Sequence, residues 1–153
     1  MPKLVTSREL IVQKKKLIEV MESLGIISSA LSFEVVSDAL FYVRFSGLSK
    51  DVVGVKIEIR ERTIRFDTYL MPYPESNESQ LFEYMLRVQS RIAPLHFEIG
   101  TEDAIYLAGS VDTARLGSED VSEAIASIIS YSDELFPKMM AIGFEGRFFP
   151  LNK

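Results

Sequence analysis

The feature that most constrains the fold is a strict alternation of apolar and polar residues in two neighbouring segments. Apolar residues occupy every second position from 53 to 59. After a polar break at Glu61-Arg62 they return at positions 64, 66 and 70, with Thr68 at the remaining position of the series. A period of two on both sides of a short break predicts two antiparallel strands with one buried and one polar face. With the apolar run at 40–45, this gives a three-strand meander. A further short strand around 33–36 is left open.

A helix is predicted before this meander, from Ser7 to Leu24, with Gly25 as its stop. Its apolar residues fall on one arc at about 100° per residue; they are Leu10, Ile11, Leu17, Ile18, Met21 and Leu24. Lys14 lies inside the same arc. We expect its stem to lie on the core and its ammonium group to reach water, and an ion pair across an interface is the alternative.

A second helix is predicted after the break at Pro72-Tyr73-Pro74, capped by Ser76 or Asn77 and ending before Pro94. Phe82, Leu86 and Ala93 widen its apolar arc to roughly 200°, more than contact with one sheet requires. Two explanations stay open: the helix is buried on two sides within the domain, or its second side meets another chain.

The remaining chain predicts a hairpin around 100–103, between strands at 97–99 and 105–111, and then one long helix. Ser118 is a natural cap for this helix, and its apolar arc continues through Pro137, where a kink is expected. The tail 143–153 carries Phe144, Phe148 and Phe149, which either fold back on the core or dock on a partner. The predicted fold class is α+β: helix, three-strand meander, helix, two-strand hairpin and helix, with an antiparallel sheet packed against the helices in a single domain, 1–153.

Composition and charge exclude several functional classes. Apolar residues make up 47% of the chain and charged residues 25%, which is typical of a globular protein. A net charge of −5 argues against a broad nucleic-acid interface. No apolar run is long enough for a membrane span, and the absence of cysteine fits a reducing compartment. We therefore expect a cytoplasmic protein.

The charges are unevenly distributed along the chain. Residues 1–16 hold five basic groups and one acidic group, whereas residues 98–134 hold nine acidic groups and one basic group. The simpler interpretation is two solvated faces, and the alternative is that one end of a molecule steers the other end of its neighbour.

The sequence offers no recognisable catalytic or cofactor motif. His96 is the single histidine, so it has no second histidine to act with, and no phosphate-binding glycine loop is present. The acidic pairs Glu102-Asp103, Glu119-Asp120 and Asp133-Glu134 suit a turn, a helix start and a helix surface, and neighbouring helical residues point about 100° apart. We predict no enzyme activity, no cofactor and no metal site.

Several segments in the second half of the chain, from Leu81 to Phe144, carry a family resemblance. They are residues 82–87, 96–99, 103–109, 131–137 and 142–144, and the step Asp133-Glu134-Leu135-Phe136-Pro137 is the most distinctive. In these segments the chain resembles the YbjN family of bacterial sensory transduction regulators, in the form seen in actinobacteria. The resemblance implies a fold similar to type III secretion chaperones, commonly dimeric and without known catalytic residues. The chain departs from the family at Gln89-Ser90, where an asparagine is frequent, and it has no tryptophan.

These observations predict a non-enzymatic protein-binding module, chaperone-like or regulatory, that acts as a homodimer and holds an unknown client or signalling partner. The predicted contact residues are those at the edges of the apolar arcs and in the aromatic tail: Phe82, Leu86, Ile129, Met140, Phe148 and Phe149. The alternative is a small-molecule sensor with a pocket between sheet and helices, for which the polar groups would be Tyr42, Tyr69, Tyr84 and Tyr106.

Overall fold

The computed structural model describes residues 7–23, 25–115 and 119–146, and within them four α-helices and a six-stranded sheet. The helices are α1 (Ser7–Ser23), the single turn α2 (Ile26–Ser29), α3 (Glu78–Ile92) and α4 (Glu119–Gly143). A short 3₁₀ turn, η1 (Thr113–Arg115), follows the last strand. The α+β class and the antiparallel sheet predicted from the sequence are confirmed.

The sheet is antiparallel throughout, in the order β1-β2-β3-β4-β6-β5. Its strands are β1 (Ser32–Ser37), β2 (Leu40–Ser46), β3 (Val52–Ile59), β4 (Thr63–Pro72), β5 (His96–Ile99) and β6 (Ala104–Asp112). The meander therefore has four strands, because the segment left open at 33–36 forms β1. β4 pairs with β6 over the length of both strands, so β5 is placed at one edge of the sheet and β1 at the other.

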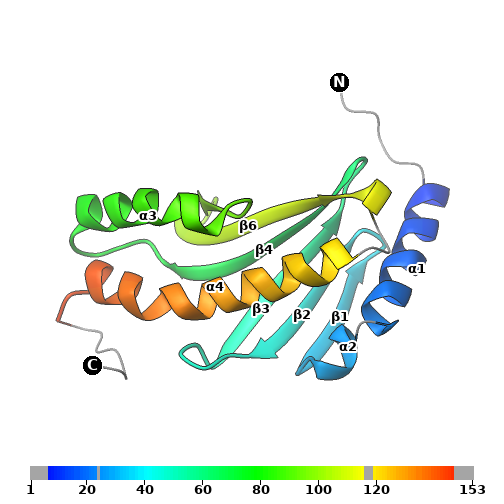
Figure 1. Ribbon diagram of the computed structural model, residues 1–153, viewed down its shortest axis with the longest axis horizontal. Helices are drawn as coiled ribbons and strands as arrows, with labels where there is room; N and C mark the ends of the chain where they lie inside the picture. Colours follow the sequence, from blue (N-terminus) through cyan, green and yellow to red (C-terminus); the bar gives the residue numbers. More distant parts are fainter. Residues whose placement is uncertain (1–6, 24, 116–118, 147–153) are drawn as a thin grey trace.

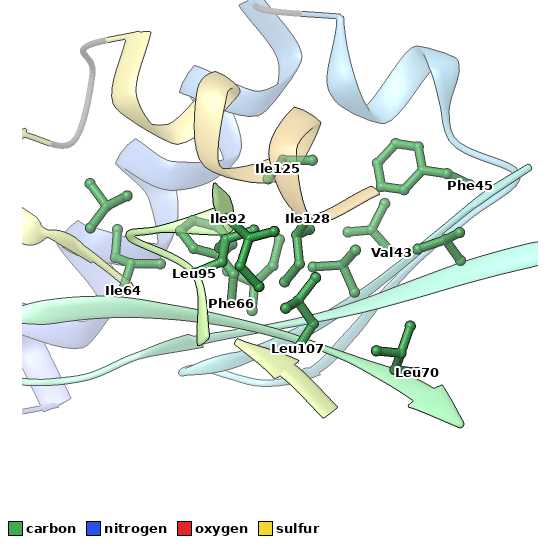
Figure 2. Packing of buried hydrophobic residues seen from close by; sticks show 14 of the residues in the cluster. Val43, Phe45, Ile64, Phe66, Leu70, Ile92, Leu95, Leu107, Ile125 and Ile128 are labelled. Atoms are coloured by element: carbon green, nitrogen blue, oxygen red, sulfur yellow. The ribbon is translucent and has the colours of Figure 1, made fainter. Parts of the chain in front are cut away.

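The helices pack on one face of this sheet (Figure 1). The inward residues of the strands alternate as predicted: on β3, Val53, Val55, Ile57 and Ile59 are buried. Figure 2 shows Ile125 and Ile128 of α4 packed over the sheet, with Phe66 and Leu107 beneath them. Residues of α1 and α3 join the same cluster, so this single layer of apolar side chains connects most of the elements.

Four local expectations need correction or completion. Ile11, placed on the buried arc of α1, is 56% exposed. Asn77 occupies the cap position of α3, but its side chain makes no cap hydrogen bond because it reaches to α4 instead. The Nζ atom of Lys14 reaches the surface, where it pairs with the exposed Asp38 of the same chain at 3.2 Å. The turn α2 was not predicted.

The last helix is continuous through Pro137, as predicted. Proline has no backbone N–H, so the carbonyl group of Asp133, four residues earlier, loses its usual partner within the helix. The hydroxyl group of Ser49, in the β2–β3 loop, donates to this carbonyl oxygen and replaces the missing bond. The predicted cap Ser118 and the residues Phe148 and Phe149 lie outside the described part of the chain.

Candidate partner-binding surface

An apolar groove of about 250 Å³ lies between α3 and the edge strand β5. Its lining is mainly apolar and is formed by Phe82, Met85, Leu86, Gln89, Phe97, Glu98 and Ile99. Leu86 is 74% exposed and Ile99 54% exposed, so both side chains project into water beside the groove. We call this surface the α3–β5 groove. The groove lies where the wide apolar arc of α3 runs beside the short edge strand β5.

The backbone edge of β5 is partly closed by Gln89. Gly100 donates to Ala104 where the β5–β6 hairpin ends, so by alternation the N–H groups of Phe97 and Ile99 point away from β6. The Oε1 atom of Gln89 accepts the Phe97 N–H at 3.2 Å. One of the two outward N–H groups of this strand is thus satisfied by a side chain of α3, which leaves side chains rather than backbone as the main contact surface.

A charged network borders the groove on the sheet face that carries no helix. Arg65 donates two hydrogen bonds to Glu98, at 3.0 and 2.5 Å, and a third to Asp67 at 3.2 Å. His96 lies 2.6 Å from the Oε2 atom of Glu98. The hydrogen bonds from Arg65 lower the pKa of Glu98 to about 2, against the opposing effect of burial and with the help of His96. Glu98 is therefore a fixed negative charge at neutral pH.

The position of α3 is fixed by the end of α4. The N–H groups of Glu75 and Ser76 both donate to the carbonyl oxygen of Gly143 at 2.9 Å, and Asn77 Nδ2 donates to Ile142 at 3.0 Å. A Cβ atom at Gly143 would meet Met71 at 3.0 Å and Pro74 at 3.1 Å, so a larger residue here would require these side chains to shift by a few tenths of an ångström. The last carbonyl groups of α4 are thereby capped by the loop that begins α3.

A second anchored surface is formed where the β2–β3 loop meets α4. The carboxylate of Asp133 accepts the backbone N–H groups of Leu48 at 3.0 Å, Ser49 at 2.9 Å and Lys50 at 2.9 Å. Burial alone would raise the pKa of Asp133, but these N–H groups outweigh it and lower the pKa. We call this set of contacts, together with the bond from Ser49 to the Asp133 carbonyl oxygen, the Asp133 clasp. It holds Leu48 at the loop tip, where that side chain is 96% exposed.

Lys50 extends the clasp to a bulge in β4. Its Nζ atom donates to the carbonyl oxygens of Tyr69 and Leu70, at 3.0 and 3.1 Å, where the register of β4 with β6 shifts. The ammonium group also lies 4.7 Å from the centre of the Phe136 ring. Burial lowers the pKa of Lys50 to about 8, although the charge of Asp133 opposes this effect.

The predicted contact residues are distributed over different surfaces. Phe82 and Leu86 meet in the α3–β5 groove, whereas Ile129 lies beside Leu48 in a shallow depression of about 420 Å³ next to the clasp. Met140 is half-buried against the core. The sequence did not single out Leu48, Phe97 or Ile99, and only the alternation around 97–99 signalled that strand.

The tyrosines proposed for a sensor pocket do not come together. Tyr42, Tyr69 and Tyr106 lie on the sheet face opposite the helices, where Tyr69 and Tyr106 meet edge to face at 5.8 Å. Tyr84 lies on α3, close enough for Glu134 of α4 to affect its pKa. A pocket between sheet and helices does exist, but none of these four residues is among its described lining residues.

The neighbouring acidic residues of α4 do not converge on one site. Asp133 and Glu134 point to different partners, since Glu134 pairs with Arg91 at 3.2 Å. Among the residues that the structure describes, no group of three or more histidine, aspartate or glutamate side chains is placed to hold a metal ion. In the same residues, no helix is long and apolar enough to cross a membrane.

Comparison with solved structures shows the same fold in chains of three protein complexes. The TM-score is 0.58 for a chain of the HopA1–SchA chaperone–effector complex, with 10% identity over 84% of this chain and 95% of that chain. It is 0.54 for a chain of the heterodimeric ExoU–SpcU complex from the type III secretion system of Pseudomonas aeruginosa, with 16% identity over 81% and 94%. A chain of the ExsC–ExsE complex gives 0.54 and 16%, over 92% and 95%.

Sequence relatives are distant. Uncharacterized proteins of Mycobacterium tuberculosis and Mycobacterium bovis are 19% identical to this chain over 102 residues, which is 67% of the chain. The match spans only 56% of the length of these relatives. No protein-family model matches the chain, so the resemblance to the YbjN family stays a prediction.

Proposed function

We propose that this protein is a non-enzymatic, chaperone-like binding module that forms a homodimer through the α3–β5 groove and holds a further protein. The observation that carries the proposal is the exposure of Leu86 and Ile99 beside a groove lined by Phe82 and Phe97. Adjacent apolar side chains left in water at a well-formed groove are typical of protein interfaces.

The charges around the groove support pairing between two copies. Glu83 and Arg87 lie one turn apart on the exposed side of α3, on the same flank of Leu86, and are 3.4 Å apart. In an antiparallel pair of α3 helices related by a twofold axis, Glu83 of one copy faces the region of Arg87 in the other. The same apolar and charged pattern therefore complements itself.

The fold supports the chaperone-like part of the proposal. The similar solved chains come from complexes described as chaperone–effector or secretion-system assemblies, so the same fold is known to hold other proteins. We also propose membership of the YbjN family and a cytoplasmic location. The segment Asp133–Pro137 supports the family proposal, because it is the most distinctive part of the sequence resemblance.

The dimer is tested by sedimentation equilibrium of the wild type and of Leu86→Asp. A charge placed in the groove should convert the dimer to a monomer, because it would be buried without a partner. Leu48→Asp is the matched control, since Leu48 is even more exposed but lies on the β2–β3 loop. A monomeric wild type, or a Leu86→Asp variant that still dimerises, refutes the dimer.

The second protein is tested by affinity capture from host lysate with the same three proteins. A specific protein that binds the wild type and Leu48→Asp but not Leu86→Asp would place the client on the groove or on the dimer that it forms. If all three proteins capture the same set, the groove has no part in holding a client.

A further inference from the structure

A pocket of about 360 Å³ lies at the C-terminal end of α3, between β6, the α3–β5 connection and the first half of α4. Its volume falls within the range of small-molecule sites. The floor is apolar and formed by the buried side chains of Phe66, Ile92, Leu95 and Val111. Figure 2 shows Ile92, Leu95 and Phe66 gathered beneath α4. A ligand here would leave water for a preformed apolar surface.

The polar groups of this pocket are not spread evenly. Asp112 of β6 and Asp120 and Glu123 of α4 lie at the end where β6 finishes and α4 starts. Tyr131, three helical turns further along α4, lies at the other end, near the carbonyl group of Arg91. The helical rise from Asp120 to Tyr131 is about 16 Å along the axis. The pocket is thus elongated, acidic at one end and aromatic at the other.

The charge of the pocket points to one class of ligand. Among its described lining residues there is no lysine, arginine or histidine. The nearby Arg91 pairs with Glu134 at 3.2 Å. The charged groups among the described lining residues are all carboxylates, which would repel an anion, whereas an ammonium group at the acidic end would find carboxylates while its apolar body covers Ile92 and Leu95.

We propose that this pocket binds a small organic cation, a primary amine with an aromatic or aliphatic body. The amine lies against Glu123 and Asp112, and the body lies along α4 towards Tyr131. The proposal is independent of the proposed dimer, because the pocket and the α3–β5 groove share no lining residue. It takes up the sensor alternative raised by the sequence, with different residues.

The probe is 2-(2-naphthyl)ethylamine, compared at pH 7 with two ligands of the same body, the neutral 2-(2-naphthyl)ethanol and the anionic 2-naphthylacetate. Binding to the full chain is measured by calorimetry and by methyl NMR shifts of Ile92 and Leu95. We expect the amine to bind about fourfold more tightly than the alcohol, the magnitude of one or two exposed ion pairs, and the carboxylate to bind more weakly than both.

Two variants locate the site. Glu123→Gln should reduce the preference for the amine and leave the affinity of the alcohol unchanged, and Glu119→Gln, outside the pocket, should change neither. Ser127→Phe should fill the pocket and abolish binding of all three probes, while Ala126→Phe on the exposed side of the same helix should have no effect. The methyl shifts of Ile92 and Leu95 in the wild type locate the probe even if Ser127→Phe fails to fold.

Several outcomes overturn the proposal. The proposal is wrong if the amine does not bind at millimolar concentration, if the carboxylate binds as tightly as the amine, or if the bound amine leaves the methyl resonances of Ile92 and Leu95 unshifted. None of these outcomes bears on the dimer, which depends on Leu86 and is measured separately.

Discussion

Replacing Asp133 by asparagine should release the β2–β3 loop at little steric cost, because the amide keeps the shape of the side chain but loses its charge. The Oδ1 atom of Asp133 accepts three N–H groups, and Oδ2 lies 3.1 Å from the Leu48 nitrogen. In Asp133→Asn, an amide NH₂ group in the Oδ2 position would face that N–H as donor against donor, and the remaining bonds would lose their charge assistance.

The magnitude follows from the number and kind of these bonds. Hydrogen bonds to a charged group contribute about 1.5–3 kcal/mol and neutral ones about 1 kcal/mol, and Asp133 is only half-buried. We therefore expect the free energy of unfolding to fall by about 2 kcal/mol, measured by urea denaturation at pH 7. Amide hydrogen exchange at residues 48–50 should accelerate as well. The matched control is Glu134→Gln, the next residue, whose exposed pair with Arg91 should contribute only a small fraction of this loss.

The pH dependence distinguishes this cause from a general loss of packing. The pKa of Asp133 in the folded protein lies below its ordinary value of 3.8. The clasp therefore stabilises the protein fully above that value, and the stabilisation is lost as the pH falls through the lower, folded-state pKa. The difference between wild type and Asp133→Asn should be constant above about pH 5 and shrink below about pH 4. A difference under about 0.5 kcal/mol, or one that persists unchanged at pH 3, refutes the reasoning.

Three further predictions concern the same helix and loop. Ser49→Ala should lower the free energy of unfolding by about 1 kcal/mol in the wild type but by less than half of that in Pro137→Ala, because the N–H restored at residue 137 competes for the Asp133 carbonyl oxygen. A double-mutant cycle by urea denaturation measures this coupling, and additive effects would contradict it. Ser132→Ala should leave the free energy of unfolding unchanged or raise it, because the Ser132 hydroxyl is buried without a hydrogen-bond partner. A decrease above about 1 kcal/mol would contradict this and would indicate a hydrogen bond to that hydroxyl. The ε-carbon resonance of Lys50 should titrate near pH 8. Since the folded pKa is depressed below 10.5, stability should also rise from about pH 8 towards pH 10.5, and a midpoint above about 10 would contradict both statements.

The sheet could be predicted from short segments of sequence, because buried and exposed side chains alternate along each strand. Along β3 and β4 every second residue faces the same core, so alternation alone gives the strands, their faces and their pairing. The alternation does not extend to β1, because Val35 and Val36 are consecutive apolar residues, and the structure places both largely exposed at the edge of the sheet. The same reason explains Ile11: α1 lies at the margin of the core, so its apolar arc is only partly covered.

The contacts that fix the surfaces could not be derived from neighbouring residues. Asp133 and Leu48 are 85 positions apart, and Asn77 bonds to Ile142 rather than to its own helix. One signal was available. A proline inside a helix frees the carbonyl group four residues before it, so Pro137 indicated that Asp133 needs an outside partner. The wide apolar arc of α3 identified Phe82 and Leu86, which line the groove, but the approach of β5 depends on the whole sheet order and could not be predicted from it.

The position of α4 in the chain has a consequence for biosynthesis. The strands β1 to β4 occupy residues 32–72, yet the helix that covers much of their apolar face begins at Glu119. At about 5–20 residues per second, the ribosome needs seconds to extend the chain from the end of β4 to the end of α4. During that interval the nascent sheet carries an uncovered apolar face and an unpaired β4 edge, since β6 is also still to be made. We therefore expect the nascent chain to need protection from aggregation until α4 is complete.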